Sequence, residues 1–81
     1  MMERREIEER LTGIFHEVFD DESITLRDDM TAEDVKDWDS FNHINLIVAV
    51  EKAFRVRFTT QEVNQMANVG EFIGLIARKL G

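Results

Sequence analysis

The chain has 81 residues, about half the length of an ordinary domain, so we expect one domain spanning residues 1–81 with a single core. Hydrophobic residues make up 43% of the chain and charged residues 33%, which is typical of a folded globular protein and excludes a disordered tail. Cysteine is absent, which excludes disulfides and thiolate metal sites. The two histidines, His16 and His43, are too few to build a zinc site alone. We expect no metal centre.

The net charge of −7 comes from 10 basic and 17 acidic residues, and a surface of this sign repels phosphate backbones and anionic lipids. We therefore expect neither nucleic-acid nor membrane binding. The longest apolar run, residues 44–50, is interrupted by Asn45 and is far shorter than the ~20 residues that span a bilayer. The first residues lack the apolar stretch of a secretory signal, which favours a cytoplasmic protein.

The first predicted helix covers residues 3–19. Its apolar residues form one stripe of an amphipathic helix: Ile7, Leu11, Ile14, Phe15, Val18 and Phe19. Residues 20–38 lose this pattern and carry isolated apolar anchors among polar residues: Ile24, Leu26, Met30 and Val35. We expect an ordered loop here, in which residues 31–34 cap a single helical turn. So long a loop in so small a domain indicates a functional segment.

The second helix is predicted to begin at Asp39 or Ser40 and to end before residues 55–58. Its apolar residues spread too widely for one narrow stripe, which predicts a largely enclosed helix: Phe41, Ile44, Leu46, Ile47, Val48, Val50, Ala53 and Phe54.

The acidic residues are concentrated before the start of this helix. Residues 17–39 hold ten acids and two bases, a net charge of −8, which indicates either a solvated loop or a docking surface for basic partners.

Capping residues predict two further helices. Residues 59–62, Thr-Thr-Gln-Glu, form a capping box that starts a short helix reaching residue 67, and Asn68 precedes a last helix that ends near residue 80. The predicted fold is all-α, a small four-helix bundle of three main helices and one short helix, with the long loop between the first and second. The predicted core includes Ile44, Ile47, Val50, Phe54, Phe58, Met66, Val69, Phe72 and Ile76.

Catalytic patterns are scarce. Ser40 and His43 are three positions apart and share a helix face, which makes a small hydrolase one hypothesis. The pattern offers His43 no orienting carboxylate and Ser40 no oxyanion site, so we expect no enzyme activity. The acidic residues between 20 and 29 lack the central glycine and final glutamate of an EF-hand loop. Taken alone, Ser40 is also a favoured helix N-cap.

The surroundings of Ser40 indicate more than a cap. The run Asp37-Trp38-Asp39-Ser40-Phe41 is followed by Ile44, Leu46, Ile47, Val50 and then Glu51-Lys52-Ala53-Phe54. It resembles the attachment-site helix of acyl carrier proteins and peptidyl carrier domains, whose signature is Asp-Ser-Leu. The resemblance extends over nearly the whole chain in the order of its helices. It implies the carrier-protein bundle and a protein that carries a group without catalysing a reaction.

In that family a phosphopantetheinyl transferase uses coenzyme A and magnesium to join 4′-phosphopantetheine to a serine, matched here by Ser40. The arm ends in a thiol that holds an acyl or aminoacyl group as a thioester, for fatty-acid, polyketide or related specialised biosynthesis. The resemblance implies that Asp39, Trp38 and Phe41 lie beside the arm. For Trp38, packing of the loop onto the bundle is an equal alternative.

The expected partners are the transferase and the acyl- or aminoacyl-loading and synthase enzymes, with Phe41, His43 and Glu51 as contact residues and the protein as a monomer. Two features depart from the family pattern. Phe41 replaces the usual leucine, and four positions that are acidic in many fatty-acid carriers are not acidic here: Asn42, Asn45, Lys52 and Ala53. We therefore expect the loop before Ser40 to contribute to recognition. The alternative function is an unmodified helical adaptor of the same fold.

Overall fold

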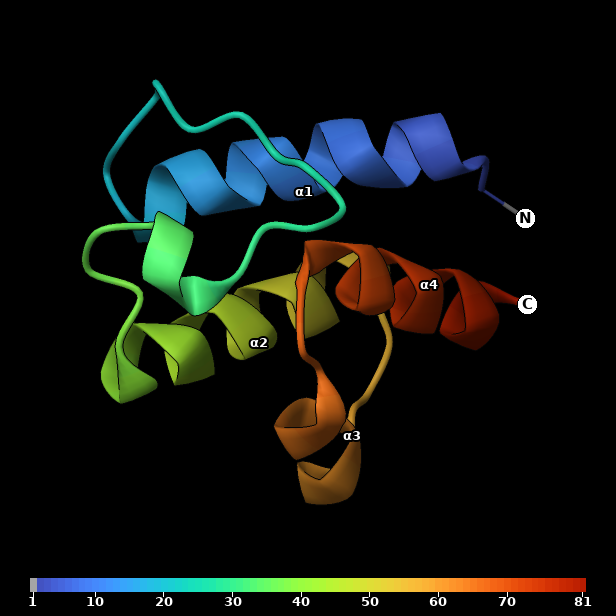
Figure 1. The fold of residues 1–81 in the computed structure, drawn as a ribbon. Coiled ribbons are helices and arrows are strands. Elements are labelled where there is room, and N and C mark those ends of the chain that lie inside the picture. The colour runs from blue at the N-terminus through green and yellow to red at the C-terminus, as the bar shows by residue number, and fades with distance from the viewer. Residues whose placement is uncertain (1) are drawn as a thin grey trace.

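The structure, a computed structural model, describes residues 2–81. Within this range it contains α1 (Arg4–Val18), α2 (Ser40–Phe54), α3 (Thr60–Gln65) and α4 (Val69–Leu80), with a 3-10 turn, η1 (Ala32–Asp34), in the long loop. Helix α1 packs on α2 and α4, and the short α3 projects to one side (Figure 1). The predicted all-α bundle is confirmed. None of the helices in residues 2–81 is long and apolar enough to cross a membrane.

The helix caps agree with the prediction from sequence. Thr31 and Asp34 form a capping box on η1, and Thr59 and Glu62 form another on α3. Asn68 caps α4 by accepting the backbone N–H of Glu71 at 2.9 Å. The predicted end of α3 at residue 67 is wrong by two residues. The backbone N–H of Ala67 donates to the Glu71 carboxylate at 2.6 Å, so this segment belongs to the entry of α4.

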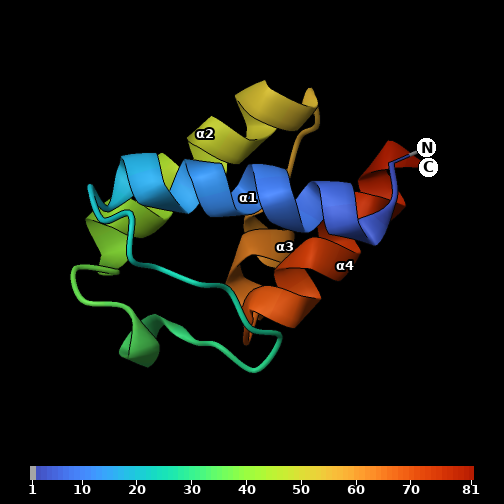
Figure 2. The ribbon, with the colours of Figure 1, turned by 90° about the horizontal axis from the view of Figure 1, so that it is seen from above.

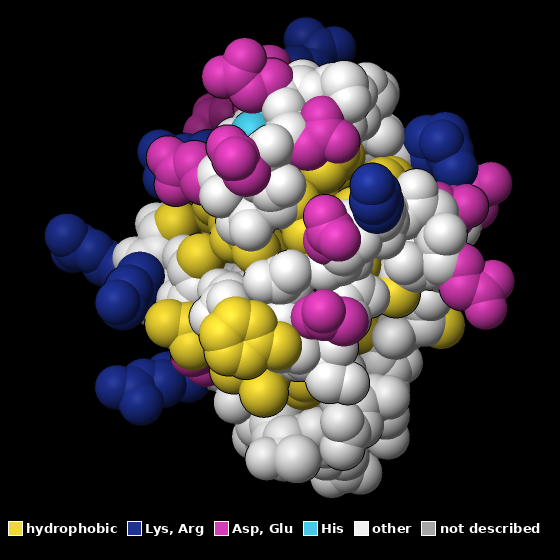
Figure 3. All heavy atoms as spheres, turned by 90° about the vertical axis from the view of Figure 1, so that its left-hand side faces the viewer, with side chains coloured by type: hydrophobic (Ala, Val, Ile, Leu, Met, Phe, Trp, Pro, Cys, Tyr) yellow, Lys and Arg dark blue, Asp and Glu magenta, His cyan; other side chains and the backbone are white. Residues whose placement is uncertain are grey.

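The prediction that α2 is largely enclosed is wrong. Phe41 is 73% exposed, Ile44 63% and Val48 42%. The prediction that Ile44 belongs to the core is therefore also wrong. These three side chains recur at helical spacing and form one stripe, because α2 covers α1 with its opposite face. Figure 3 shows hydrophobic side chains exposed on the face of the molecule that carries the start of α2. We call Phe41, Ile44 and Val48 the α2 stripe.

The other predicted core residues lie in or against the core. Phe58 and Met66 are half-buried against it, and the remaining expected residues are buried: Ile47, Val50, Phe54, Val69, Phe72 and Ile76. Helix α1 contributes Ile7, Leu11, Phe15 and Phe19. The loop contributes Met30 and Val35 as buried anchors, and Ile24 and Leu26 as half-buried ones, as predicted.

The long loop docks on the start of α4. The backbone N–H groups of Val69 and Gly70 donate to the carbonyls of Met30 at 2.8 Å and Asp28 at 2.9 Å. The loop therefore supplies acceptors for two N–H groups that have no partner within the helix. Figure 2 shows the loop running from the end of α1 past α4 and returning through η1 to α2. The start of α1 and the end of α4 lie on the same side of the molecule, away from the start of α2 (Figures 1 and 2).

Gly70 is predicted to be intolerant of a side chain because of this contact. A Cβ atom at Gly70 would lie 3.0 Å from the carbonyl oxygen of Asp28 and 3.1 Å from its Cβ, so Gly70→Ala must displace the loop. We expect a loss of about 1–3 kcal/mol in the free energy of unfolding, measured by urea denaturation followed by circular dichroism. At Gly74, in the same helix, such a Cβ meets no other segment of residues 2–81 within 4 Å. Gly74→Ala should therefore raise stability by about 0.5–1 kcal/mol. Equal stabilisation by both changes would contradict the tight docking.

Candidate functional site

Ser40 is the first residue of α2, and its side chain is exposed. The cap of this helix is Asp39, whose Oδ1 accepts the backbone N–H of Asn42 at 2.8 Å. The Asn42 side chain in turn donates to the Asp37 carbonyl at 2.7 Å, which fixes the end of the loop. Interpreting Ser40 as the N-cap is therefore wrong. Among the hydrogen bonds of residues 2–81, none uses the Ser40 hydroxyl, so this group is free for chemistry.

Trp38, two residues before Ser40, holds the loop against α1. Its ring meets Phe15 edge-on, with centroids 5.3 Å apart and planes at 87°, and lies 5.9 Å from the ring of Phe19. The indole and the imidazole of His43 are nearly coplanar, with planes at 23° and centroids 6.0 Å apart. These contacts favour the anchoring interpretation of Trp38. They also fix His43 beside Ser40.

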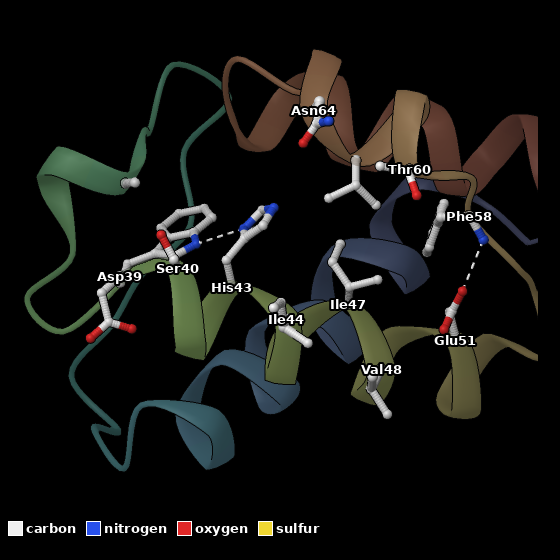
Figure 4. Close-up of a pocket in the computed structure, with 13 residues that line it drawn as sticks. Asp39, Ser40, His43, Ile44, Ile47, Val48, Glu51, Phe58, Thr60 and Asn64 are labelled. Atoms are coloured by element: carbon white, nitrogen blue, oxygen red, sulfur yellow. Dashed lines mark hydrogen bonds between the residues drawn. The ribbon is translucent and has the colours of Figure 1, made fainter.

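A hydrogen bond joins the facing edges of the two rings. The Nε1–H of Trp38 donates to Nδ1 of His43 at 3.0 Å (Figure 4). An indole N–H can only donate, so Nδ1 must offer its lone pair and the neutral ring must carry its proton on Nε2. Burial lowers the pKa of His43, which favours this neutral form at neutral pH.

This geometry gives no support to the hydrolase hypothesis. The Nδ1 atom of His43 faces an indole N–H, whereas a serine hydrolase places an orienting carboxylate at the corresponding nitrogen. Within residues 2–81, no hydrogen bond connects Ser40 to His43.

The lowered pKa of His43 predicts a pH dependence of stability. The unfolded chain binds a proton at His43 below about pH 6.5, while the folded protein binds it only at lower pH. The free energy of unfolding should therefore fall as the pH drops below about 6.5, until the folded pKa is reached. Hydrogen bonds to Ser23 and Lys79 lower the pKa of Asp21 and Glu62, but these carboxyl groups act only below about pH 4.5.

We expect His43→Phe to reduce this slope between pH 5 and 6.5. Urea unfolding of both proteins over pH 5–7.5 provides the measurement. A slope that is identical in the two proteins would contradict the assignment to His43.

A groove of about 840 Å³ begins beside Ser40 and runs between α2 and α3 (Figure 4). Ser40 and His43 lie at one end, and Glu51 and Phe58 at the other. Apolar side chains of both helices line its length: Ile44, Ile47, Val48 and Val63. Thr60 and Asn64 of α3 add polar groups along the opposite wall. The groove can therefore take an extended chain attached at Ser40.

Glu51 and Phe41, both expected as contact residues, have different surroundings. The Oε2 atom of Glu51 accepts the backbone N–H of Phe58 at 2.9 Å, so this carboxylate ties the α2–α3 connection to α2. Phe41 directly follows Ser40 and is exposed on the α2 stripe. Phe41 is therefore available to a partner, whereas the Glu51 carboxylate is engaged in a hydrogen bond within the protein.

The acidic loop does not form one cluster at Ser40. Asp28 pairs with Arg4 at 3.0 Å, and Asp29 pairs with Arg27 at 3.3 Å. The Asp28 backbone is bound to α4, and Figure 2 shows that part of the loop far from the start of α2. The carboxylates that remain near Ser40 in the chain are those of Asp37 and Asp39.

The chain matches no protein-family model and no curated protein. Among solved structures it is similar to the solution NMR structure of the holo acyl carrier protein from Geobacter metallireducens. The two chains are 41% identical with a TM-score of 0.86, and the match covers 90% of this chain and 84% of the other. The chain belongs to the acyl carrier protein family. The acyl carrier protein fold is that of a carrier and not of an enzyme. The family resemblance and the carrier role expected from the sequence are therefore confirmed.

Proposed function

We propose that the protein carries an acyl or aminoacyl group as a thioester on a 4′-phosphopantetheine arm attached to Ser40. One observation carries this proposal: the Ser40 hydroxyl is exposed and unbonded at the mouth of the groove, in a chain 41% identical to a holo acyl carrier protein. The single hydrophobic core supports treating residues 1–81 as one carrier domain.

The residues around Ser40 fit a phosphodiester. The first N–H groups of α2 point out of the helix end, where the helix dipole favours negative charge. Asp39, the nearest carboxylate in sequence, is engaged by the Asn42 N–H. In the transfer, Ser40 Oγ forms the new O–P bond and the phosphoanhydride of coenzyme A breaks, releasing the adenosine bisphosphate. The serine proton goes to a base on the transferase, because no side chain among residues 2–81 accepts a hydrogen bond from Ser40.

The arm supplies a thiol that this cysteine-free chain lacks, and cargo is held on that thiol. The chain's own contribution is to present Ser40 at a rigid helix end and to offer the groove beside it. Tethering raises the concentration of the cargo at the active sites of partner enzymes. Fatty-acid, polyketide and related specialised biosynthesis all use carriers of this kind, and the apolar lining of the groove supports an acyl cargo.

The exposed α2 stripe supports a docking role for the start of α2 toward the transferase and the loading and synthase enzymes. We expect Phe41→Ala to slow transfer to Ser40, with an effect that persists at high salt, because it removes apolar contact area. Asp37→Asn should cause a smaller loss that salt removes. Asp29→Asn, remote from Ser40 and paired with Arg27, is the charge control. A salt-sensitive loss in Asp29→Asn as large as that in Asp37→Asn would show that the whole loop steers binding.

Intact mass spectrometry tests the proposed function. The protein is treated with coenzyme A, magnesium and a promiscuous transferase, and a carrier gains the mass of one phosphopantetheine group. An unmodified adaptor keeps its mass, and that result would contradict the proposal. A hydrolase would turn over a generic ester without treatment, and turnover lost in His43→Ala would also contradict it.

A further inference from the structure

Polar groups face each other across the groove near the end that holds Ser40. Figure 4 shows the second ring nitrogen of His43 directed from α2 toward α3, where the side chain of Asn64 lies on the opposite wall. The apolar side chain of Ile47 lies farther along the groove. Val63 of α3 also lines the groove. A simple alkyl chain in this position would leave the polar groups without partners.

His43 can act only as a donor toward the groove. Its Nδ1 atom accepts from Trp38 at 3.0 Å, so the proton of the neutral ring lies on Nε2. Within residues 2–81, no side chain or carbonyl accepts this proton. Since no buried side-chain nitrogen in this range lacks a partner, the Nε2 atom of His43 is not buried. The Nε2–H is therefore open to whatever occupies the groove.

The ring that carries this donor is held rigidly. Trp38 holds it by the hydrogen bond to Nδ1, in nearly the same plane, and Trp38 itself packs against Phe15 and Phe19 of α1. A donor held in one orientation loses little freedom when it binds, which favours a hydrogen bond to a flexible chain.

We propose that His43 is a positioning residue, whose Nε2–H donates a hydrogen bond to an amide carbonyl of the phosphopantetheine arm and holds the arm in the groove. This inference rests on the proposed function. The arm is attached at Ser40, at the end of the groove where His43 lies. The arm contains amide groups joined by short apolar segments, and the groove is lined by both polar and apolar side chains. A typical hydrogen bond shifts the population of groove-bound arm by roughly 2- to 10-fold.

The test uses holo protein loaded from coenzyme A labelled with ¹³C and ¹⁵N in its pantetheine. In the wild type, one arm carbonyl resonance should shift downfield from its position in free coenzyme A. Nuclear Overhauser contacts should join the arm to the methyl groups of Val63. Ring ¹⁵N spectra should show the His43 proton on Nε2, and a proton on Nδ1 instead would overturn the proposal.

Three variants separate positioning from a general structural effect. His43→Phe keeps an aromatic ring but removes the donor, so the downfield shift and the contacts to the arm should be lost. His43→Gln supplies an amide donor and should restore part of the shift. Asn45→Ala removes a polar side chain of α2 that does not line the groove, and it should leave the arm unchanged. An arm resonance that is the same in wild type and His43→Phe would overturn the proposal.

The loading step distinguishes this inference from the proposed function. Wild-type protein that gains no phosphopantetheine would contradict the proposed function and the inference together. Protein that is loaded at Ser40, with an arm that behaves as in free coenzyme A, would contradict only the role of His43.

Discussion

Ser40→Ala is expected to abolish phosphopantetheinylation completely and to leave the fold intact. The chain has two serines, Ser23 and Ser40, and only Ser40 lies at the groove. Since Asp39 caps α2 and the Ser40 hydroxyl makes no hydrogen bond within residues 2–81, the free energy of unfolding should change by less than about 0.5 kcal/mol. Transfer from a reporter-tagged coenzyme A and urea denaturation provide the two measurements.

Two controls separate chemistry from capping. Ser23→Ala should be labelled like the wild type, because Ser23 does not line the groove and its hydroxyl donates to Asp21 in the loop. Asp39→Ala removes the cap and should cost about 1 kcal/mol of stability. Labelling that survives in Ser40→Ala would place the modification elsewhere. A stability loss in Ser40→Ala as large as that in Asp39→Ala would show that the serine does contribute to the cap.

Phe15→Ala is expected to cause the largest loss of stability among the changes considered, about 3–5 kcal/mol. Phe15 is completely buried, and its ring contacts the rings of Phe19 and Trp38. Its removal leaves a cavity at the point where the loop is anchored to α1. Urea denaturation followed by circular dichroism measures the loss. The emission of Trp38, the single tryptophan, reports whether the loop has loosened in the folded protein.

Phe41→Ala is the matched control, because it makes the same truncation at a side chain that is 73% exposed. It should change stability by less than about 0.5 kcal/mol. Similar losses in the two variants would show that Phe41 is covered in solution. A loss below about 1 kcal/mol in Phe15→Ala would show that the anchor of Trp38 is not part of the cooperative core.

The helices and most of their ends could be predicted from the sequence because the signals are local. The amphipathic stripe of α1 extends over its whole length, and its observed bounds, Arg4–Val18, differ from the prediction by one residue at each end. The capping boxes at Thr31 and Thr59 join residues only three positions apart. Such contacts form wherever the local sequence allows them, so they are visible without the tertiary structure.

The environment of Ser40 could be predicted only in part, because it depends on the path of the loop. The sequence predicts a hydroxyl at the start of this helix, but it does not distinguish Asp39 from Ser40 as the residue that caps it. The hydrogen bond from Trp38 to His43 exists only because Trp38 is pressed against α1. Ile44 is exposed because α3 projects outward and does not cover it. The spacing of apolar residues along α2 does not predict the position of α3. The contact between Gly70 and Asp28 joins segments 42 positions apart.

The start of α1 and the end of α4 lie on the side of the molecule away from the start of α2 (Figures 1 and 2). A purification tag, a biotin anchor or a second protein joined to either end therefore emerges behind the bundle, clear of Ser40. Protein immobilised on a surface through either end presents Ser40 to the solution. A short linker can also join the two ends into a cyclic chain without crossing the groove.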